Sequence, residues 1–458
     1  MIFARLRGAA LCAAFLLVSA CSAGPELPPR AEPPSSGAET PAGDAIPPGE
    51  IRMSDNVKHV ANVPRSAPLN GPMDWNTDLA FQGDYAYMGN FGGFTVFDIS
   101  DPTSPKTVSQ VACPAQQNDV SVYENLLILS VDEPRSGEGC DSTDEERAWE
   151  GLRIFDISDK SSPRFVSAVA TDCGSHTHTM VPKDDKLYVY VSSPGPEPES
   201  TTCPPPHKLL QIVEIPLGDP GSARVAAAPD LPIQGQENGT GCHDITAYPE
   251  KNLAAAACFG DGFLLDIADP LSPKVLQQVS DQENFQIWHS ATFNNDATKV
   301  LFTDELGGGS APTCDRGTPA TKGADAIYDL ADGQLHKRGY FKIPREQQED
   351  ENCVAHNGSL LPVPGKDIMV QAWYQGGVSF LDFTDSANPK EIGYFERGPF
   401  EGEDAGIAGS WSAYYYNGYV YSADIREGLD VLRIDDPLTD PAKEVDMADF
   451  NVQTQKSY

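Results

Sequence analysis

Histidines are the residues of this sequence whose type and position best suit chemistry. Five of the eight stand at the start of short apolar segments: His176, His178, His243, His289 and His356. Imidazole is a common ligand of Zn, Cu, Fe and Ni, and three or four imidazoles with one open position suit a catalytic metal. If the apolar segments are equivalent strands around one centre, these side chains converge there. The pattern therefore predicts a site for one transition metal ion.

Carboxylates accompany this histidine pattern. Asp119 and Asp244 are expected beside the histidines, where a carboxylate fixes the tautomer of an imidazole. Other residues that end neighbouring segments could line the same pocket: Asp304, Glu305, Trp373 and Asp424. The alternative is structural, because a histidine before an inner strand can hold the preceding loop by hydrogen bonds, and repeat copies inherit such a device. Both interpretations stay open at this point.

An internal repeat indicates which elements would position these residues. The copies lie roughly 50–60 residues apart, a period typical of repeat architectures. The segments are 93–111, 151–169, 262–279, 377–395 and 428–445, with weaker copies at 209–227 and 325–341. Each copy is an apolar strand ending in Asp, a turn and a second strand, and another strand pair separates the copies. Four short antiparallel strands per unit, repeated radially, are typical of a β-propeller.

The strand-and-turn sequence GFTVFDISDP at 93–102 and its copies resemble the LVIVD-repeat family of β-propellers. The resemblance covers residues 57–446. It implies an all-β fold, a seven-bladed β-propeller of four-stranded antiparallel blades, and no particular chemistry. Either 56–64 or 442–450 would supply the last outer strand. The histidine ring is also similar to the histidine-bound metal sites of two propeller enzyme groups, carotenoid oxygenases and selenium-binding-type methanethiol oxidases, by analogy alone.

The N-terminal residues predict export. Arg5 and Arg7 before the apolar run 8–18 are typical of a signal peptide over residues 1–20. The following sequence Val-Ser-Ala-Cys, ending at Cys21, resembles a bacterial lipobox, which implies a lipid on Cys21. An ordinary secretory signal is the alternative. The expected location is the bacterial cell envelope, outside the cytoplasm, with membrane contact through the lipid alone.

Composition divides the remaining chain into three parts. Residues 21–56 are rich in proline and poor in large apolar residues, which predicts a disordered tether. Residues 57–450 hold the repeats and are assigned to the propeller. Residues 451–458 are assigned to a C-terminal tail.

The cysteine count agrees with export. Cys12 belongs to the signal and Cys21 to the anchor, so an even number remains: Cys113, Cys140, Cys173, Cys203, Cys242, Cys258, Cys314 and Cys353. Eight cysteines in an oxidising compartment favour four disulfides, although they allow 105 connectivities. Pairing between neighbours is the working hypothesis: Cys113–Cys140, Cys173–Cys203, Cys242–Cys258 and Cys314–Cys353.

The long insertions are all expected on one face of the ring. With the strands of a blade lettered a to d from the axis outwards, the b–c and d–a loops share a face. The insertions 132–150, 192–206 and 305–324 are b–c loops, and 229–242, 343–355 and 396–410 are d–a loops. Concentration of insertions on one face usually marks the binding face.

The net charge narrows the range of possible functions. With 32 Lys and Arg against 67 Asp and Glu, the net charge of −35 excludes a nucleic-acid binder. The leading hypothesis is a monomer that binds a protein, glycan or small ligand on this acidic, disulfide-braced face. The alternative is a metal-dependent enzyme, with an oxidoreductase as the expected class, built on His178, His243, His289 and His356. A purely structural envelope scaffold is the third possibility.

Overall fold

The computed structural model describes residues 46–144, 148–195, 203–235, 240–314, 317–402 and 405–458, and these residues are almost entirely strand and loop. Their helices are short 3₁₀ turns: η1 (Pro220–Ser222), η2 (Pro249–Lys251) and η3 (Asp440–Glu444). Within these ranges, no helix has the length and apolar character needed to cross a membrane. The prediction of an all-β fold is confirmed.

Most strands form antiparallel units of four in which consecutive strands are neighbours. One unit contains β3 (Asn76–Gln82), β4 (Tyr85–Asn90), β5 (Gly93–Asp98) and β6 (Lys106–Ala112). The next contains β7 (Gln117–Tyr123), β8 (Leu126–Arg135), β9 (Trp149–Asp156) and β10 (Arg164–Ala170). A further unit contains β11 (Thr177–Lys183), β12 (Lys186–Ser192), β13 (Gln211–Pro216) and β14 (Arg224–Ala227).

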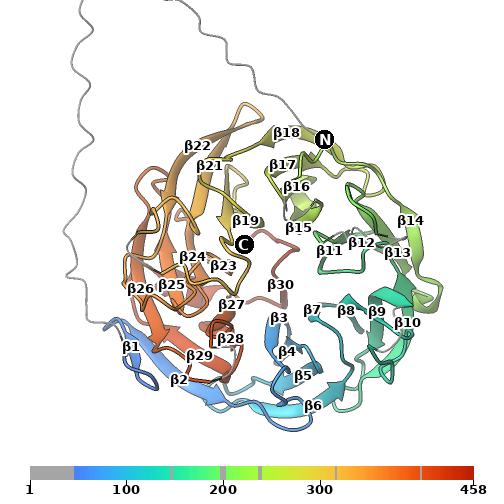
Figure 1. Cartoon of the computed structure of the whole chain (residues 1–458), viewed down its shortest axis with the longest axis horizontal. Helices are drawn as coiled ribbons and strands as arrows, with labels where there is room; N and C mark the ends of the chain where they lie inside the picture. Colours follow the sequence, from blue (N-terminus) through green and yellow to red (C-terminus); the bar gives the residue numbers. More distant parts are fainter. Residues whose placement is uncertain (1–45, 145–147, 196–202, 236–239, 315–316, 403–404) are drawn as a thin grey trace, which may run out of the picture. The chain divides into compact units, whose positions relative to one another are not determined.

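The pattern continues along the chain. β15 (Cys242–Tyr248), β16 (Leu253–Cys258), β17 (Asp261–Asp266) and β18 (Lys274–Val279) form one unit. β19 (Trp288–Phe293), β20 (Lys299–Asp304), β21 (Asp325–Ala331) and β22 (Gln334–Phe341) form the next, followed by β23 (Asn357–Leu361), β24 (Ile368–Ala372), β25 (Val378–Asp382) and β26 (Lys390–Arg397). Figure 1 shows these units around a common centre, with the first strand of each unit innermost.

Strand β2 (Val57–Val63) completes the last unit from the N-terminal side. It pairs antiparallel with β29 (Gly428–Ile434), outside β27 (Ser410–Tyr416) and β28 (Tyr419–Asp424). Of the two candidates for this outer strand, 56–64 is therefore the one used. A short parallel bridge between β23 and β27 joins two neighbouring groups into one nine-stranded sheet, beside four four-stranded sheets and one five-stranded sheet.

Strand β1 (Ile51–Met53) corrects the predicted extent of the tether. It pairs with β26 as an additional outer strand, and Ile46 before it is buried. The prediction of a disordered tether over 21–56 is therefore wrong for residues 46–56, because Ile51–Met53 pairs with the edge of β26 and Ile46 is buried. The predicted signal peptide, Cys21 and the rest of the tether lie outside the described residues.

The apolar core lies between neighbouring units. Phe94 and Val96 of β5, for example, share one cluster with Val122 of β7 and Leu129 of β8. Strands near the centre are covered on both faces, which explains why β16 consists of small apolar residues, LAAAAC, and is almost completely buried. The outer strands β6, β10 and β18 are largely exposed or half-buried.

The repeated aspartates hold turns, as expected from their place at strand ends. The Asp98 carboxylate accepts a hydrogen bond from the Ser100 N–H at 2.9 Å, and Asp156 accepts one from the Ser158 N–H at 2.8 Å. A side chain that bonds the backbone two residues on stabilises such a turn. These aspartates position the strands and do not face the centre of the ring.

The C-terminal residues occupy the centre of the ring, which composition did not indicate. Strand β30 (Asp449–Asn451) pairs with the innermost strand β3, and the C-terminus lies near the centre in Figure 1. Beyond it, the tail bonds inner strands one after another. Thr454 donates to the Met180 carbonyl, Gln455 exchanges hydrogen bonds with Phe293, and Tyr458 donates to the Leu361 carbonyl. Residues 451–458 are thus an integral part of the fold.

Four disulfides brace the loops. The bonds are Cys113–Cys140, Cys173–Cys203, Cys242–Cys258 and Cys314–Cys353, the same pairing as the hypothesis of neighbouring partners. Cys242–Cys258 joins the start of β15 to the end of β16. The other three hold the long loops before β7, β9, β11, β13, β21 and β23, on the face where the inner strands begin.

Candidate functional site

Four histidines form a continuous row of rings where the inner strands begin. His176 precedes β11, His243 and His289 are the second residues of β15 and β19, and His356 precedes β23. The ring centroids of successive members are 4.3, 4.1 and 4.2 Å apart. Four consecutive units thus each contribute one imidazole.

Irregular pairing at the start of two inner strands accompanies His243 and His289. The register of β15 shifts between Cys242 and Asp244, on either side of His243. That of β19 shifts between Trp288 and Ala291, around His289. A bulge re-aims a side chain, and bulges are common beside active sites.

Each of the four rings is held through its Nδ1 by an oxygen atom. The partners are Asp132 Oδ2 for His176 (2.5 Å), Asp244 Oδ1 for His243 (3.1 Å), Thr303 Oγ1 for His289 (3.4 Å) and the Trp411 carbonyl for His356. An Nδ1–H that donates to oxygen leaves the lone pair on Nε2, the arrangement typical of metal-binding histidines. Within the described ranges, no hydrogen bond occupies any of these four Nε2 atoms.

Glu305 lies between two of the imidazoles. Its carboxylate oxygens are 3.8 Å from His243 Nε2 and 3.8 Å from His356 Nε2. The Tyr374 hydroxyl donates to Glu305 Oε1 at 2.5 Å and orients the carboxylate. A Cβ atom at Gly309 would come within 2.9 Å of the same oxygen, so this position requires the small glycine.

Burial lowers the pKa of two histidines in the row. It lowers the pKa of His356 to about 3, against the opposing effect of the Trp411 carbonyl. Burial also holds the pKa of His289 well below its usual value, and the neighbouring histidines add to this effect. His176 differs, because Asp132 outweighs burial and raises its pKa. At neutral pH, His289 and His356 are therefore neutral and can bind a cation.

A cavity of about 180 Å³ adjoins the histidines. Its walls come from several units and loops: Trp75, Phe91, Gln117, His176, His243, Glu305, Gly308, Gly309, Ser310, His356, Tyr374, Ile407 and Trp411. His289 is buried behind this lining. The cavity leaves space for a ligand beside the imidazoles.

The donor set fits a transition metal. Two groups of three side chains each offer ligand atoms within 4.8 Å of one another: His243, Asp244 and His289, and His289, Glu305 and His356. Nitrogen-rich sets with one carboxylate suit Zn, Fe, Ni or Cu. His289 belongs to both groups and is the centre of the candidate metal site.

His178 and Asp119 lie apart from this row, which corrects their predicted place. His178 is fully buried, with its Nε2 bonded to the Ser121 hydroxyl and its Nδ1 2.8 Å from Ser130 Oγ. Asp119 contacts His178, at 3.1 Å from Nδ1, and none of the other predicted metal ligands in the described part of the chain. His178 is the second residue of β11, yet its ring bonds Ser121 and Ser130, whereas His176, just before the strand, lines the cavity.

The other expected pocket residues are divided among different places. Asp304 accepts backbone hydrogen bonds from Gln286, Ile287 and Gly323, and burial raises its pKa to about 6. Trp373 is fully buried and packs against Phe341. Of the four residues, Glu305 is the one that joins the histidines. Asp132, Thr303 and Tyr374 were missed: Asp132 comes from the preceding unit, whereas Thr303 and Tyr374 come from other parts of the units that hold His289 and His356.

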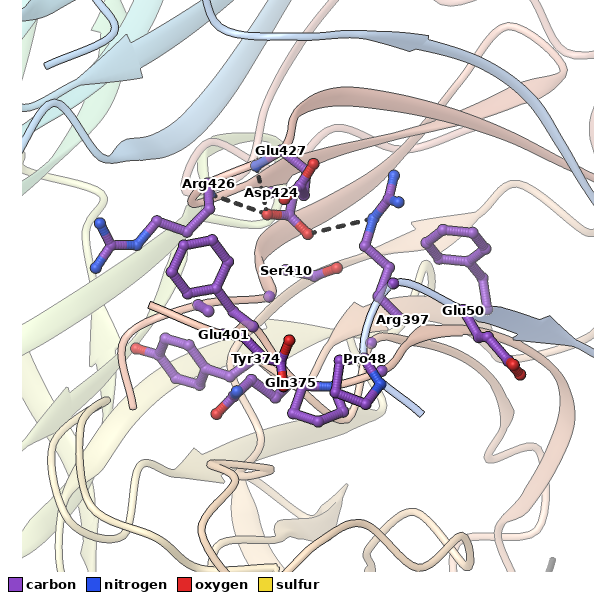
Figure 2. Close-up of a pocket in the computed structure, with 18 residues that line it drawn as sticks. Pro48, Glu50, Tyr374, Gln375, Arg397, Glu401, Ser410, Asp424, Arg426 and Glu427 are labelled. Atoms are coloured by element: carbon purple, nitrogen blue, oxygen red, sulfur yellow. Dashed lines mark hydrogen bonds and ion pairs between the residues drawn. The ribbon is translucent and has the colours of Figure 1, made fainter. Parts of the chain in front are cut away.

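A larger pocket, of about 380 Å³, lies between the loops that follow β26 and β28. Figure 2 shows Asp424 in its wall, accepting hydrogen bonds from the backbone N–H groups of Arg426 and Glu427 and paired with Arg397 at 3.6 Å. Burial raises the pKa of Asp424 to about 6. This pocket shares Tyr374 with the histidine cavity but has no histidine in its lining, so the candidate metal ligands belong to the smaller cavity.

Comparison with known proteins agrees with this architecture. The LVIVD repeat matches residues 76–112 and 148–171, which contain β3–β6 and β9–β10. No curated protein matches the chain.

Solved structures share the fold at low identity. The β-propeller domain of Cps50 (Swd1) from Myceliophteria thermophila superposes with a TM-score of 0.50 at 8% identity, covering 79% of this chain and 98% of that one. Raptor from Chaetomium thermophilum gives 0.49 at 12% identity over 80% of this chain and 29% of its own, and the computationally designed Ika8 gives 0.45 at 10% identity over 82% and 99%. Together with the matched repeats, the first of these likenesses shows a β-propeller that contains LVIVD repeats.

Proposed function

We propose that this protein binds one transition metal ion in the cavity formed by His176, His243, His289 and His356, with Glu305 as the anionic ligand. The observation that carries the proposal is the shared tethering of all four rings through Nδ1. A histidine that only holds a loop has no need of a free Nε2 beside three others. Four such rings next to one carboxylate favour metal binding over the structural interpretation.

A metal-dependent oxidoreductase is the second candidate, favoured by the cavity itself. The ligand atoms lie beside about 180 Å³ of space, so a bound ion would keep room for a substrate. Sites that retain an open position are typical of catalytic rather than structural metals. Binding of a protein, glycan or small ligand on this disulfide-braced face, the leading hypothesis from the sequence, is compatible with both.

Metal content tests the proposal. The full-length chain, produced without a histidine tag, is loaded with Zn, Cu, Fe or Ni in turn, dialysed and analysed by elemental mass spectrometry. We expect about one ion per chain in the native protein and little in a folded His243→Ala/His289→Ala/His356→Ala variant. His336→Ala is the matched control, because His336 is exposed on β22. Equal metal in the triple variant, or none in the native protein, contradicts the proposal.

We further propose that the ring has seven blades. Support comes from the nine-stranded sheet, in which strand pairing joins β23 to β27 through just two described residue pairs, the parallel pairs Asn357–Ser412 and Gly358–Ala413. Counting β23–β26 and β27–β29 with β2 as separate blades gives seven four-stranded units.

We also propose export with a lipid on Cys21. Four disulfides support an oxidising compartment, since such bonds are rare in reducing ones. Mass spectrometry of the N-terminal peptide from membranes would detect acylated Cys21, and Cys21→Ser would release the chain into the soluble fraction. An unmodified Cys21 in mature native protein contradicts the anchor.

A further inference from the structure

We infer that the histidine cavity takes a small, neutral, single-ring phenol as its organic ligand. The expected role of the phenol oxygen rests on the proposed metal site. The preference for an aromatic ring rests on the cavity walls alone. The inference therefore names a ligand class for the proposed centre.

The wall that continues from the histidines is aromatic. The Trp411 ring lies 5.1 Å from the His356 ring and 6.5 Å from Phe91, and Phe91 lies 5.0 Å from Trp75. Tyr374 adds a further ring, 6.1 Å from Trp411. The row of four imidazoles thus passes directly into a row of apolar rings around one cavity.

The aromatic residues come from units that contribute no histidine to the row, apart from Tyr374. Trp75 and Phe91 flank the strand pair β3–β4, and Trp411 is the second residue of β27, the position that His243 and His289 occupy in β15 and β19. Trp411 also lies at a register shift, as those histidines do. One side of the site is therefore built for a metal and the other for an apolar surface.

Aromatic walls favour a flat ring, because rings pack in tilted and edge-to-face pairs about 4.5–7 Å apart and gain more than aliphatic groups of equal area. Size sets the upper limit. A dry apolar cavity of about 150 Å³ accommodates benzene, so a cavity of about 180 Å³ suits one ring with a small substituent. Two fused rings would extend beyond its walls into solvent.

Charge decides the substituent. Glu305, Asp244 and Asp132 lie among the histidines, so a ligand carboxylate such as benzoate would meet like charges. A phenol is neutral near pH 7, with a pKa near 10 as in tyrosine. Its oxygen can accept a hydrogen bond or bind a metal ion, while its ring faces Trp75, Phe91 and Trp411.

Saturation-transfer NMR and calorimetry with phenol test the inference on the full-length chain, both metal-free and zinc-loaded. We expect phenol to bind the metal-free protein at least fivefold more tightly than cyclohexanol or benzoate, and zinc to strengthen phenol binding a further tenfold. Trp411→Ala should weaken phenol binding at least tenfold in both forms. Phe165→Ala, which removes an exposed ring on β10, is the control and should leave binding unchanged.

The outcomes separate the two proposals. Phenol binding no better than that of cyclohexanol and benzoate, or unaffected by Trp411→Ala, overturns the inference whatever the zinc content. If the protein binds no zinc but phenol binding still depends on Trp411, the metal site is overturned and the aromatic pocket is supported. If Trp411→Ala fails to fold, Phe91→Leu supplies the same comparison with a smaller change.

Discussion

At the scale of single residues, the oxygen atom bonded to each Nδ1 distinguishes these four histidines from histidines that only hold a loop. Asp132, Asp244, Thr303 and the Trp411 carbonyl belong to different units or loops, yet each bonds the same ring nitrogen. His178 shows the contrast, since serine hydroxyls occupy both of its nitrogens. The free Nε2 atoms, more than the number of histidines, support the proposal of a metal site.

Asp132→Asn should weaken metal binding about 10–100-fold, the usual effect of losing a partner that orients a metal-bound histidine. Asp132 raises the pKa of His176 despite its burial, so the amide would also lower that pKa. Affinity is measured by competition with a chromogenic chelator. Asp185→Asn, an exposed aspartate on the turn before β12, is the control. Unchanged affinity in Asp132→Asn would show that His176 is not a ligand.

Glu351→Gln should change the pH dependence of stability. Burial raises the pKa of Glu351 to about 7, above the value of 4.5 expected in the unfolded chain. The ionised form therefore costs stability, which falls as the pH rises from about 4.5 through about 7. Above pH 8 the variant should be more stable by about 1–2 kcal/mol, and below pH 4.5 the two should agree. Denaturant unfolding at both pH values measures this, with exposed Glu349→Gln as control; a constant difference across pH contradicts it.

The histidines of the site, Glu305 and one partner, Asp244, were predictable, whereas the other partners were not. Repeat alignment places His243, His289 and His356 at equivalent positions, so their convergence follows from the symmetry of the ring. His178 was wrongly included because its contacts with Ser121 and Ser130 of the preceding unit depend on tertiary packing, which the local sequence does not show. Asp132, on β8 of the preceding unit, and Tyr374, just after β24, reach the site through tertiary packing, which no local pattern encodes.

At the scale of elements, the C-terminal tail links the innermost strands of successive units. β30 and the residues after it bond the inner strands β3, β7, β11, β15, β19 and β23 in turn. These contacts lie towards the ends of the inner strands, away from the histidines at their starts. The tail thus ties the units together around the centre. Composition gives no sign of this, because the tail is short, polar and lacks a repeat.

Deletion of residues 449–458 should lower the free energy of unfolding by at least about 2 kcal/mol, since it removes several buried hydrogen bonds to inner strands. Thermal and denaturant unfolding measure the change. Lys456→Ala, which alters an exposed side chain of the same segment, should have an effect within about 0.5 kcal/mol. A truncated chain as stable as the intact one would show that the ring closes without the tail.

At the scale of the whole molecule, strands near both termini close the ring, and four disulfides brace its loops and strands. β2 pairs with β29 across more than 360 positions of sequence, and β30 pairs with β3 across a similar separation. The four disulfides each link loops or strands 16 to 39 residues apart. The propeller itself was predictable from its repeats, whereas the roles of both termini required knowledge of which edges remained uncovered.

Removing one disulfide should destabilise the chain and, in one case, the site. Cys242→Ala/Cys258→Ala should cost about 2–4 kcal/mol and weaken metal binding, because His243 adjoins Cys242. Cys113→Ala/Cys140→Ala should cost a similar amount while leaving metal affinity unchanged, because that bond joins other units. Unfolding and chelator competition on both double variants test this. Equal metal affinity in the two would contradict a role for the Cys242–Cys258 bond in positioning His243.

The most direct test of the metal site is anomalous X-ray diffraction from crystals of the full-length protein loaded with zinc. The account predicts one anomalous peak at the histidine row, about 2.0–2.1 Å from the Nε2 atoms of His243, His289 and His356, with Glu305 in contact. A cavity without a peak under loading conditions, or a zinc ion bound elsewhere with these histidines unchanged, would contradict it and return the histidines to a structural role.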